Sequence, residues 1–444
     1  MKKKTVLTTI LAASMTIAAC GTASNDSSAD EGKITITLKH GYRSENIGKY
    51  SEETGVLTML QKFREDYPDI EVVEEQVAFE EYGLKAQTLA ASNDLPDVFQ
   101  LPGSYMSNFV KNGMLAELNE DLDKRPEWRD GYRKGTFDRA TYDGSIYGIP
   151  MAAGPTHIIF YNSKMFAEVG YSEFPATWEE LRDASEKLKA KGILPFAFAN
   201  KDKGYALDMW FSVLADRFAG PEWTKSIVEG TGAKYTDPEF VSALTLLSDM
   251  AKAEYFNKDL NSIDGDAMHR YFYEGKAAAF VDGIWDVNNQ VTNAPKDVLD
   301  ATKVAVFPSV AGGKGNPKSS SGGAGVYYSV SSSVEPGPKR DAIMTLLQYL
   351  TGDGSAKIMA SVGGFPAYDP GEFDESKLHR LAVDTYGAAN AAPASRIFGL
   401  WFEASVNDVL KTGLQDLLIG ARTPEQVAEE TQEEYEFYLE NKDN

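Results

Sequence analysis

Two kinds of segment alternate along the chain. In the short ones apolar and polar residues alternate, and in the longer ones apolar residues recur at helical spacing. Ile34–Leu38 alternates apolar residues with threonine and predicts a first strand. The helical pattern over residues 56–67 stops at Pro68, and Ile70–Val73 predicts a second strand. Strands that alternate with helices of about 10 to 15 residues are typical of βαβ units. The pattern therefore predicts an α/β fold class with a largely parallel sheet.

The same alternation continues through the rest of the chain. Thr177 stands three residues before a glutamate, which is the spacing of a capping box at the start of a helix. Buried strands are expected over 277–281 and 326–330. The segment 312–325 is rich in glycine and serine but lacks the Gly-Lys-Ser/Thr ending of a phosphate-binding loop. We interpret it as a mobile loop that crosses between two halves of the protein, and Met151–Thr156 as another crossing.

The N-terminus has the features of a secretion signal that ends in a lipid attachment site. Three lysines precede an apolar run that is shorter than the roughly 20 residues a membrane-spanning helix needs. Cys20 is the only cysteine, and it directly follows Ile17-Ala18-Ala19. We predict a signal peptide over 1–19 and lipidation of Cys20, with a plain secretory signal as the alternative. The small and acidic residues of 20–32 predict a lipidated, flexible tether.

Composition narrows the functional classes. Without the leader about 425 residues remain, enough for two or three domains. The formal net charge of −22 becomes −25 without the three leader lysines, and such a surface repels nucleic acid. With Cys20 lipidated no thiol remains, the four histidines lack zinc-site spacing, and residues 259–266 lack the terminal glutamate of a calcium loop. We expect no cofactor, no metal and no catalytic residues.

Aromatic residues form 11% of the chain, and two tryptophans stand where a ring can reach the surface. Trp285 follows a glycine-containing turn, and Trp401 precedes a polar helix. A flat indole suits the apolar face of a pyranose ring, whose hydroxyls seek carboxylates and amides. By position alone each ring could equally belong to the core.

Six groups of residues carry a family resemblance, in addition to the lipid attachment site. In chain order they are Tyr147–Pro150, Phe160–Phe166, Pro175–Leu181, Phe272–Ala278 with Gly283–Trp285, Gly363–Ala367 and Gly420–Glu425. With these motifs in family order, the chain resembles the family 1 extracellular solute-binding proteins of bacterial ABC importers, which include the maltose-binding protein.

The resemblance implies a two-lobed fold of the type II periplasmic-binding-protein kind. In this fold the ligand lies in a cleft between two lobes that are joined by hinge crossings. The expected lobes are 33–152 plus about 313–362, and 153–312 plus about 363–444. The crossing loops predicted from glycine and proline agree with this division.

The resemblance also implies a receptor, not an enzyme, that binds a di- or oligosaccharide and delivers it to ABC permease subunits with a cytoplasmic ATPase. We expect a monomer, anchored by lipid to the extracellular face of a Gram-positive-type cell membrane. In a Gram-negative cell the anchor would hold it on the periplasmic side of the inner membrane. Two alternatives remain open: a secreted carbohydrate-active enzyme such as a glycosidase, and the same fold with a charged, non-sugar solute.

Candidate ligand contacts follow from the family motifs and from strand ends. Trp285 and Trp401 match sugar-stacking tryptophans of the family. His40 and Asp282 are further candidates that could instead be a solvated turn histidine and a turn cap. Pro102–Tyr105 replaces an aspartate-arginine pair of the maltose-binding pattern, so maltose itself is not the expected ligand. The remaining candidates, each of which could be surface or core instead, are Tyr42, Gln100, Thr156, Tyr205, Asp208 and Trp210.

Overall fold

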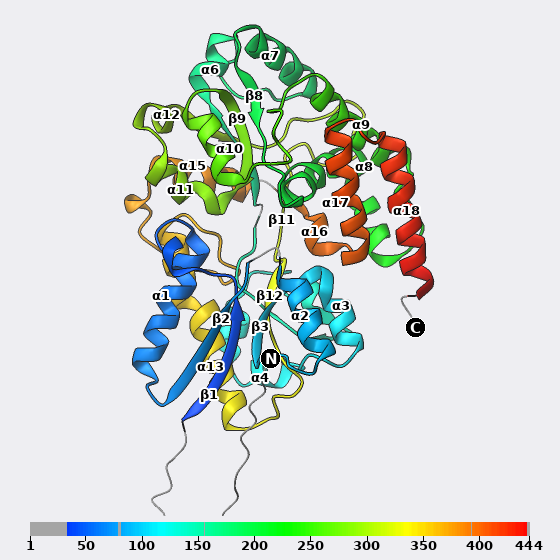
Figure 1. Ribbon diagram of the computed structural model, residues 1–444. Helices are drawn as coiled ribbons and strands as arrows, with labels where there is room; N and C mark the ends of the chain where they lie inside the picture. Colours follow the sequence, from blue (N-terminus) through cyan, green and yellow to red (C-terminus); the bar gives the residue numbers. More distant parts are fainter. Residues whose placement is uncertain (1–32, 79–80, 155, 392, 442–444) are drawn as a thin grey trace, which may run out of the picture. The chain divides into compact units, whose positions relative to one another are not determined.

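The computed structural model describes residues 33–78, 81–154, 156–391 and 393–441 (Figure 1). The predicted signal peptide, Cys20 and the tether lie outside the described residues. Within the described ranges, no helix combines the length and the apolar character needed to cross a membrane.

The first sheet is built from two separate stretches of the chain. Its strands are β1 (Ile34–His40), β2 (Ile70–Gln76), β3 (Val98–Pro102), β6 (Ile149–Pro150) and β12 (Val326–Val330), in the spatial order β2-β1-β3-β12-β6. β1, β2, β3 and β12 are labelled in Figure 1. β1 is parallel to β2 and β3, and β12 is antiparallel to β3 and β6. Because β12 follows the second sheet in sequence, the chain contributes to this sheet twice.

Two hydrophobic clusters cover opposite faces of the first sheet, because successive residues of a strand point to opposite sides. In β12, Tyr328 and Val330 belong to the cluster with Phe63 and Leu347, whereas Tyr327 belongs to the cluster with Phe109. The surrounding helices are α1 (Ser51–Asp66), α2 (Tyr82–Ala91), α3 (Gly103–Lys111), α4 (Asn119–Asp123), α5 (Pro126–Asp130), α13 (Pro338–Thr351) and α14 (Asp353–Ser361). A small hairpin pairs β4 (Thr141–Tyr142) with β5 (Ser145–Ile146).

The second sheet has mixed strand directions. Its strands are β7 (His157–Asn162), β8 (Leu194–Ala197), β9 (Ala277–Gly283) and β10 (Thr302–Ala305), in the order β10-β7-β9-β8. β7 is antiparallel to both β9 and β10, and only β8 and β9 are parallel. The expectation of a largely parallel sheet is therefore wrong here, because the apolar pattern of a strand does not encode its direction. In consequence β9 ends where β7 begins, with Gly283 opposite His157.

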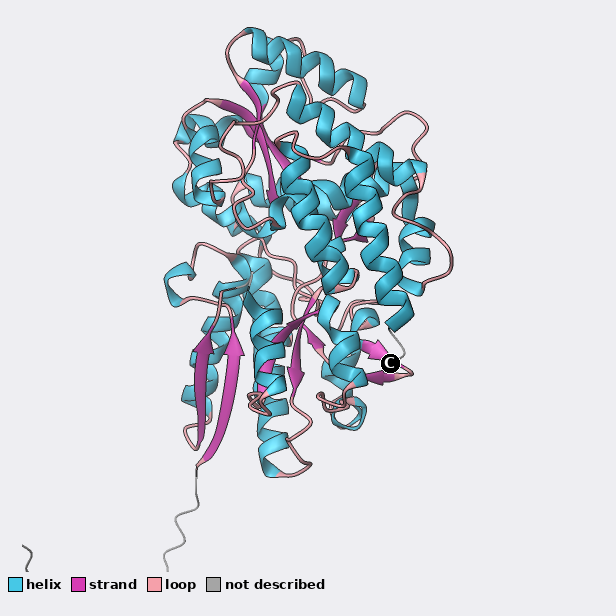
Figure 2. Ribbon diagram, turned by 45° about the vertical axis from the view of Figure 1, so that its right-hand side comes forward, coloured by secondary structure: helices cyan, strands magenta, loops and turns pink. Residues whose placement is uncertain are grey.

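Helices surround the second sheet as well (Figure 2). The capping box predicted at Thr177 is confirmed: its hydroxyl accepts from the Glu180 N–H (3.3 Å), and the Glu180 carboxylate accepts from the Thr177 N–H (3.2 Å). The π-helix η4 (Tyr205–Phe211) leads into α8 (Ser212–Glu229). The other helices are α6 (Ser163–Glu168), α7 (Trp178–Ala190), α9 (Pro238–Lys252), α10 (Gly265–Tyr273), α11 (Val287–Asn293), α12 (Lys296–Ala301), α15 (Arg380–Ala391), α16 (Phe398–Trp401), α17 (Ala404–Leu418) and α18 (Pro424–Asn441).

Three crossing segments run side by side between the two sheets. The Thr156 N–H donates to the Ser321 carbonyl (2.8 Å), and the Ala153 N–H donates to the Phe365 carbonyl (3.1 Å). Ser321 lies in the short strand β11 (Ser320–Gly322), which pairs with β13 (Ala394–Arg396). The crossings therefore support one another through backbone hydrogen bonds.

The glycine-rich segment before β11 is held by a buried arginine. Arg217 of α8 donates to the carbonyls of Phe307 (3.0 Å) and Asn316 (2.9 Å) and to the Ser319 hydroxyl (2.6 Å). Burial lowers the pKa of Arg217 to about 10, and the neighbouring Asp216 carboxylate accepts from Ser319 (2.6 Å). The expectation of a mobile loop is corrected accordingly, since this segment is attached to α8.

Candidate functional site

The turn that follows β9 presents Trp285 next to the first crossing segment. The Ile284 N–H donates to the Thr156 carbonyl (2.8 Å). A Cβ built on Gly283 would lie 2.1 Å from Cε2 of Trp285, so the indole rests against the glycine backbone. The His157 ring meets the indole in a T-shaped contact, with centroids 5.5 Å apart. The glycine and the histidine thus set the position of a half-buried indole ring.

His157 connects this turn to the crossings. Its Nδ1 hydrogen-bonds the Ser321 hydroxyl (2.6 Å), and its carbonyl accepts from the Ser320 hydroxyl. Burial lowers the pKa of His157 to about 3, so the imidazole is neutral at physiological pH. The ring therefore acts as a neutral packing and hydrogen-bonding element between Trp285 and β11.

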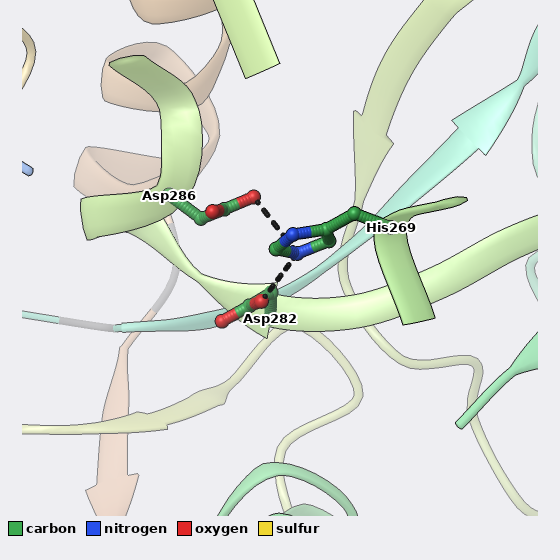
Figure 3. A group of neighbouring side chains, drawn as sticks. All are labelled: His269, Asp282 and Asp286. Atoms are coloured by element: carbon green, nitrogen blue, oxygen red, sulfur yellow. Dashed lines mark hydrogen bonds and ion pairs between the residues drawn. The ribbon is translucent and has the colours of Figure 1, made fainter. Parts of the chain in front are cut away.

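A buried histidine and two aspartates lie beside the turn (Figure 3). His269 Nε2 is 3.0 Å from Asp282 Oδ2 and 3.3 Å from Asp286 Oδ2. The Asn289 amide donates to His269 Nδ1 (3.2 Å) and to Asp286 Oδ1 (2.8 Å). The Tyr205 hydroxyl donates to Asp282 Oδ2 (3.3 Å). This cluster joins η4, α10, the end of β9 and the start of α11.

Burial and like charge determine the protonation of this cluster. Burial raises the pKa of Asp286 to about 7; the charge of His269 opposes that shift, and the charge of Asp282 adds to it. Burial alone would lower the pKa of His269, but the two carboxylates outweigh it and raise that pKa. A second imidazole proton would lie on Nδ1 and face the Asn289 donor. The same Asn289 donor also faces Oδ1 of Asp286, so the extra proton that the cluster holds near neutral pH is shared between His269 and Asp286.

The three side chains also form the one group among the described residues whose ligand atoms lie close enough to hold a metal ion. Their ligand atoms are within 4.8 Å of one another. However, Nδ1 of His269 accepts a hydrogen bond from Asn289, which places the proton of the neutral ring on Nε2. Nε2 is the atom that a metal would need, so the hydrogen bonds favour a proton-bridged cluster.

A pocket lies where residues near the first sheet meet η4 and α17. Asp208 accepts from the Gly399 N–H (3.0 Å), and burial raises its pKa to about 6. Oδ1 of Asn407 is buried and has no hydrogen-bond partner among the described residues. The lining residues are Gly83, Pro102, Ser104, Tyr105, Asp208, Gly399, Leu400, Ala404, Asn407, Asp408 and Lys411. The pocket therefore offers carboxylate, amide, ammonium and hydroxyl groups beside an apolar wall.

Comparison with known proteins identifies the family. The family model described as bacterial extracellular solute-binding protein matches residues 51–357. The chain belongs to this family. The predicted family and the two-lobed α/β fold class are confirmed.

Two relatives and one solved structure show the extent of the similarity. The chain is 24% identical over 232 residues to an uncharacterized ABC transporter extracellular-binding protein of Pyrococcus horikoshii, a match that spans 51% of each protein. It is 25% identical over 307 residues to the galactooligosaccharide-binding protein of Bacillus subtilis, covering 66% of this chain and 68% of that protein. A solved chitin oligosaccharide binding protein is 26% identical, with a TM-score of 0.78 over 90% of this chain and 98% of that one.

In this solute-binding protein the candidates at the ends of β1 and β3 bond to one another. His40 is fully buried, and its Nε2 contacts Glu74 Oε1 (2.8 Å). The Tyr42 N–H donates to His40 Nδ1 (3.1 Å), and the Gly41 N–H donates to Gln100 Oε1 (3.1 Å). The alternative interpretation of His40 as a solvated turn histidine is therefore wrong. The side chains of His40 and Gln100 therefore support the strand ends from inside by accepting hydrogen bonds from the backbone that follows β1.

The other candidates of the solute-binding protein fall into different environments. Thr156 lies in the crossing, where its hydroxyl donates to the Ser321 carbonyl (3.0 Å). Trp401 is partly buried, with the Arg396 guanidinium 4.5 Å from its ring centroid. Trp210 is 2% exposed and enclosed by the rings of Phe196, Phe198, Phe256 and Phe307. We leave Trp210 out of the proposed site because no face of its indole is free.

Several residues of these sites were not predicted. Tyr105, Asn407 and Lys411 line the pocket from helices that are about 300 residues apart in sequence, and no local pattern joins them. In the sequence, His269 is one of four histidines without the spacing of a zinc site, and nothing local links it to Trp285. The one available signal for its partners was the aspartate in the otherwise apolar run Ala277–Gly283.

Proposed function

We propose that this solute-binding protein is a receptor for a neutral oligosaccharide and has no catalytic activity. The observation that carries the proposal is the half-buried ring of Trp285, which Gly283 and His157 hold in place at the end of β9. Such a ring can stack on the apolar face of a pyranose. It is the main reason for choosing a sugar over a charged solute.

η4 connects this ring to the pocket. Tyr205 near its start bonds to Asp282, and Asp208 one turn later lines the pocket. Asp208 and Oδ1 of Asn407, which has no partner in the described part of the chain, would accept hydrogen bonds from sugar hydroxyls, and Lys411 would donate to them. A pyranose chain that extends from Trp285 toward Asn407 would meet an apolar ring first and polar partners after it. An extended ligand of this kind favours an oligosaccharide over a monosaccharide.

The names of relatives support this substrate class. One relative is named for galactooligosaccharide, one solved structure is a chitin oligosaccharide binding protein, and another with a TM-score of 0.78 belongs to a study of xylan utilization. We therefore place this chain among receptors that deliver a di- or oligosaccharide to ABC permease subunits and a cytoplasmic ATPase. In the proposed cycle the lobes, divided near residues 152, 312 and 362, close on the sugar.

The proposed anchor is a lipid on Cys20, followed by the tether 20–32. It would keep the receptor on the outer face of the cell membrane at a high effective concentration beside its permease. Substitution Cys20→Ser is expected to release the protein into the medium while its sugar affinity stays unchanged.

Thermal shift with a panel of galacto-, chito-, xylo- and maltooligosaccharides and their monosaccharides tests the proposal. We expect one oligosaccharide series to raise the melting temperature, and calorimetry to give one bound molecule per chain. Trp285→Ala should then weaken binding about tenfold or more, since ring stacking contributes about 1 to 3 kcal/mol. Trp178→Phe provides a matched control at a tryptophan away from the turn.

Two results would contradict the proposal. Chromatography that detects shortened products after incubation would favour a glycosidase. A melting temperature that rises only with polyamines or phosphorylated polyols would favour the charged-solute alternative. If Trp285→Ala leaves the dissociation constant unchanged, Trp285 is not part of the site.

A further inference from the structure

Two buried aspartates stand on either side of the turn that carries Trp285. Asp282 is the penultimate residue of β9, and Asp286 ends the 3-10 turn Ile284–Asp286 that precedes α11. Both carboxylates face the imidazole of His269, which comes from α10 (Figure 3). One side chain therefore joins the two ends of the turn.

Each carboxylate is fixed by a second hydrogen bond. Oδ1 of Asp282 accepts from the Gly283 N–H (2.7 Å), and Oδ1 of Asp286 accepts from the Asn289 amide (2.8 Å). The same Asn289 amide donates to Nδ1 of His269 (3.2 Å), which directs the Nε2–H toward both aspartates. The geometry leaves His269 a single orientation, in which it bridges them.

The indole has little freedom once the turn is fixed. One part of it lies against the Gly283 backbone, and its edge meets His157. A shift of either end of the turn would therefore move the indole as a unit. Because a stacking ring must be correctly oriented before the ligand arrives, such a shift would reduce affinity.

We propose that His269 is a positioning residue that orients Trp285 for ligand binding by bridging Asp282 and Asp286. The proposal rests on the function proposed above, because it assumes that Trp285 contacts the ligand. His269 itself is buried and has no need to touch the ligand.

The charges around the bridge make it sensitive to pH. Within the described part of the chain, the ion pairs of Asp282 and Asp286 are with His269, and no lysine or arginine pairs with either. The other titratable groups that face the cluster are Tyr50 before α1, Tyr205 of η4, and Asp266 and Tyr273 of α10, with Lys49 paired to Asp266. Since burial raises the pKa of Asp286 to about 7, the bridge gains or loses a proton near neutral pH.

A spectroscopic test needs no ligand. The protein is labelled with 5-fluorotryptophan, and the ¹⁹F resonance of Trp285 is assigned by its loss in Trp285→Phe. We expect this resonance to shift between pH 5.5 and 8.5 with one midpoint near neutral. The shift should disappear in His269→Phe and in Asp286→Asn, while His269→Gln, which keeps a donor, should retain a resonance close to the wild-type position at pH 6. His379→Gln is the matched control, because it removes a histidine outside the cluster.

Three outcomes of that experiment would overturn the proposal. One is a Trp285 resonance that is the same in His269→Phe as in the wild type. Another is a pH-dependent shift of the Trp285 resonance that persists in Asp286→Asn. This second variant decides the question if His269→Phe does not fold. The third is a shift of the resonance on adding Zn²⁺, which would mean that Nε2 binds a metal instead of bridging the aspartates.

Affinity measurements connect the bridge to binding. With the oligosaccharide that gives the largest thermal shift, His269→Phe should weaken binding about tenfold and His269→Gln less than about threefold. In a Trp285→Ala background His269→Phe should add little, because the residue acts through the ring. An equal loss in both backgrounds would overturn the proposal. If no sugar binds, the proposed function fails, whereas the fluorine experiment still decides whether His269 positions the ring.

Discussion

Each half of the protein buries a histidine beside the end of a strand, but the two histidines come from different elements, since His40 is the last residue of β1 and His269 reaches the end of β9 from α10. His40 ends β1 and contacts Glu74 of β2, which also pairs with Arg64. His269 contacts two aspartates, and no arginine or lysine of the described residues pairs with either of them. The first cluster thus balances one carboxylate with a cation, whereas the second leaves two carboxylates to share one imidazole.

This difference determines how each cluster responds to pH. Hydrogen bonds from His40 and Arg64 outweigh the effect of burial and lower the pKa of Glu74 to about 2. Glu74 therefore keeps its charge throughout the physiological range. Burial and the Asp282 charge raise the pKa of Asp286 to about 7. The balance of charges around each histidine therefore differs, and in the second cluster it brings the pKa of an aspartate close to neutral pH.

The largest effect in this comparison should come from Glu74→Gln. The substitution removes the charge that pairs with Arg64 and leaves one acceptor oxygen for two donors, His40 Nε2–H and the Arg64 guanidinium, so we expect a loss of about 2 to 3 kcal/mol in the free energy of unfolding at pH 7. The folded-state pKa is below the ordinary value, so this contribution is complete above about pH 4.5 and falls as the pH drops toward 2. Urea unfolding of both proteins at pH 7 and pH 3 measures the difference.

Glu71→Gln provides a control on the same strand, because Glu71 has an exposed side chain. A Glu74→Gln variant as stable as the wild type at pH 7 would contradict the view that the first cluster is a charged support.

Asp286→Asn should change the free energy of unfolding less than Glu74→Gln does, and with the opposite dependence on pH. Between the ordinary carboxyl pKa of 3.8 and about 7, the folded wild type holds a proton that the unfolded chain has released. The free energy of unfolding of the wild type should therefore fall as the pH rises through this range. The variant has no such group, so from pH 5 to pH 8.5 it should gain about 1 to 2 kcal/mol relative to the wild type.

Denaturant unfolding at pH 5, 7 and 8.5 measures this change, with Asp297→Asn in α12 as the control, because Asp297 is exposed. Parallel pH curves for wild type and Asp286→Asn would mean that the second cluster does not titrate near neutral pH, and the contrast between the two histidines would then disappear.

The sequence predicted well what depends on neighbouring residues. The strand Val326–Val330 has the predicted bounds, and the capping box at Thr177 forms as expected. Both features depend only on residues that are close together in the sequence. The mixed strand directions of the second sheet could not be predicted, because the apolar pattern of a strand is the same whether its neighbour is parallel or antiparallel. The attachment of the glycine-rich loop was missed because Arg217 lies about 100 residues before it.

The site was predicted only in part, for the same reason. The local turn predicts Trp285 as a ligand contact, and this stays a prediction, whereas Trp210, predicted from its position near a helix start, is enclosed by four phenylalanines from distant segments. The segments around His40 and His269 predict a strand end and a helix, but only the fold shows which carboxylates and cations face each histidine. The proton chemistry of a buried group depends on such long-range contacts, which no short motif records.

The smallest effect should come from Lys49→Met, which tests the link between the two halves near the second cluster. Lys49 pairs with Asp266 of α10 at 3.4 Å, and the Asn288 amide donates to the Gly48 carbonyl (3.2 Å). Both charged groups are partly exposed, so the pair should contribute less than about 0.5 kcal/mol, and added salt should weaken it. We expect sugar affinity in Lys49→Met to change by less than about twofold, measured by calorimetry at low and high salt. A weak link is what a receptor that closes on its ligand requires, because a strong one would hold the halves together without sugar. A loss of tenfold would mean instead that the Lys49 contact stabilises the closed form as much as the sugar-stacking ring does.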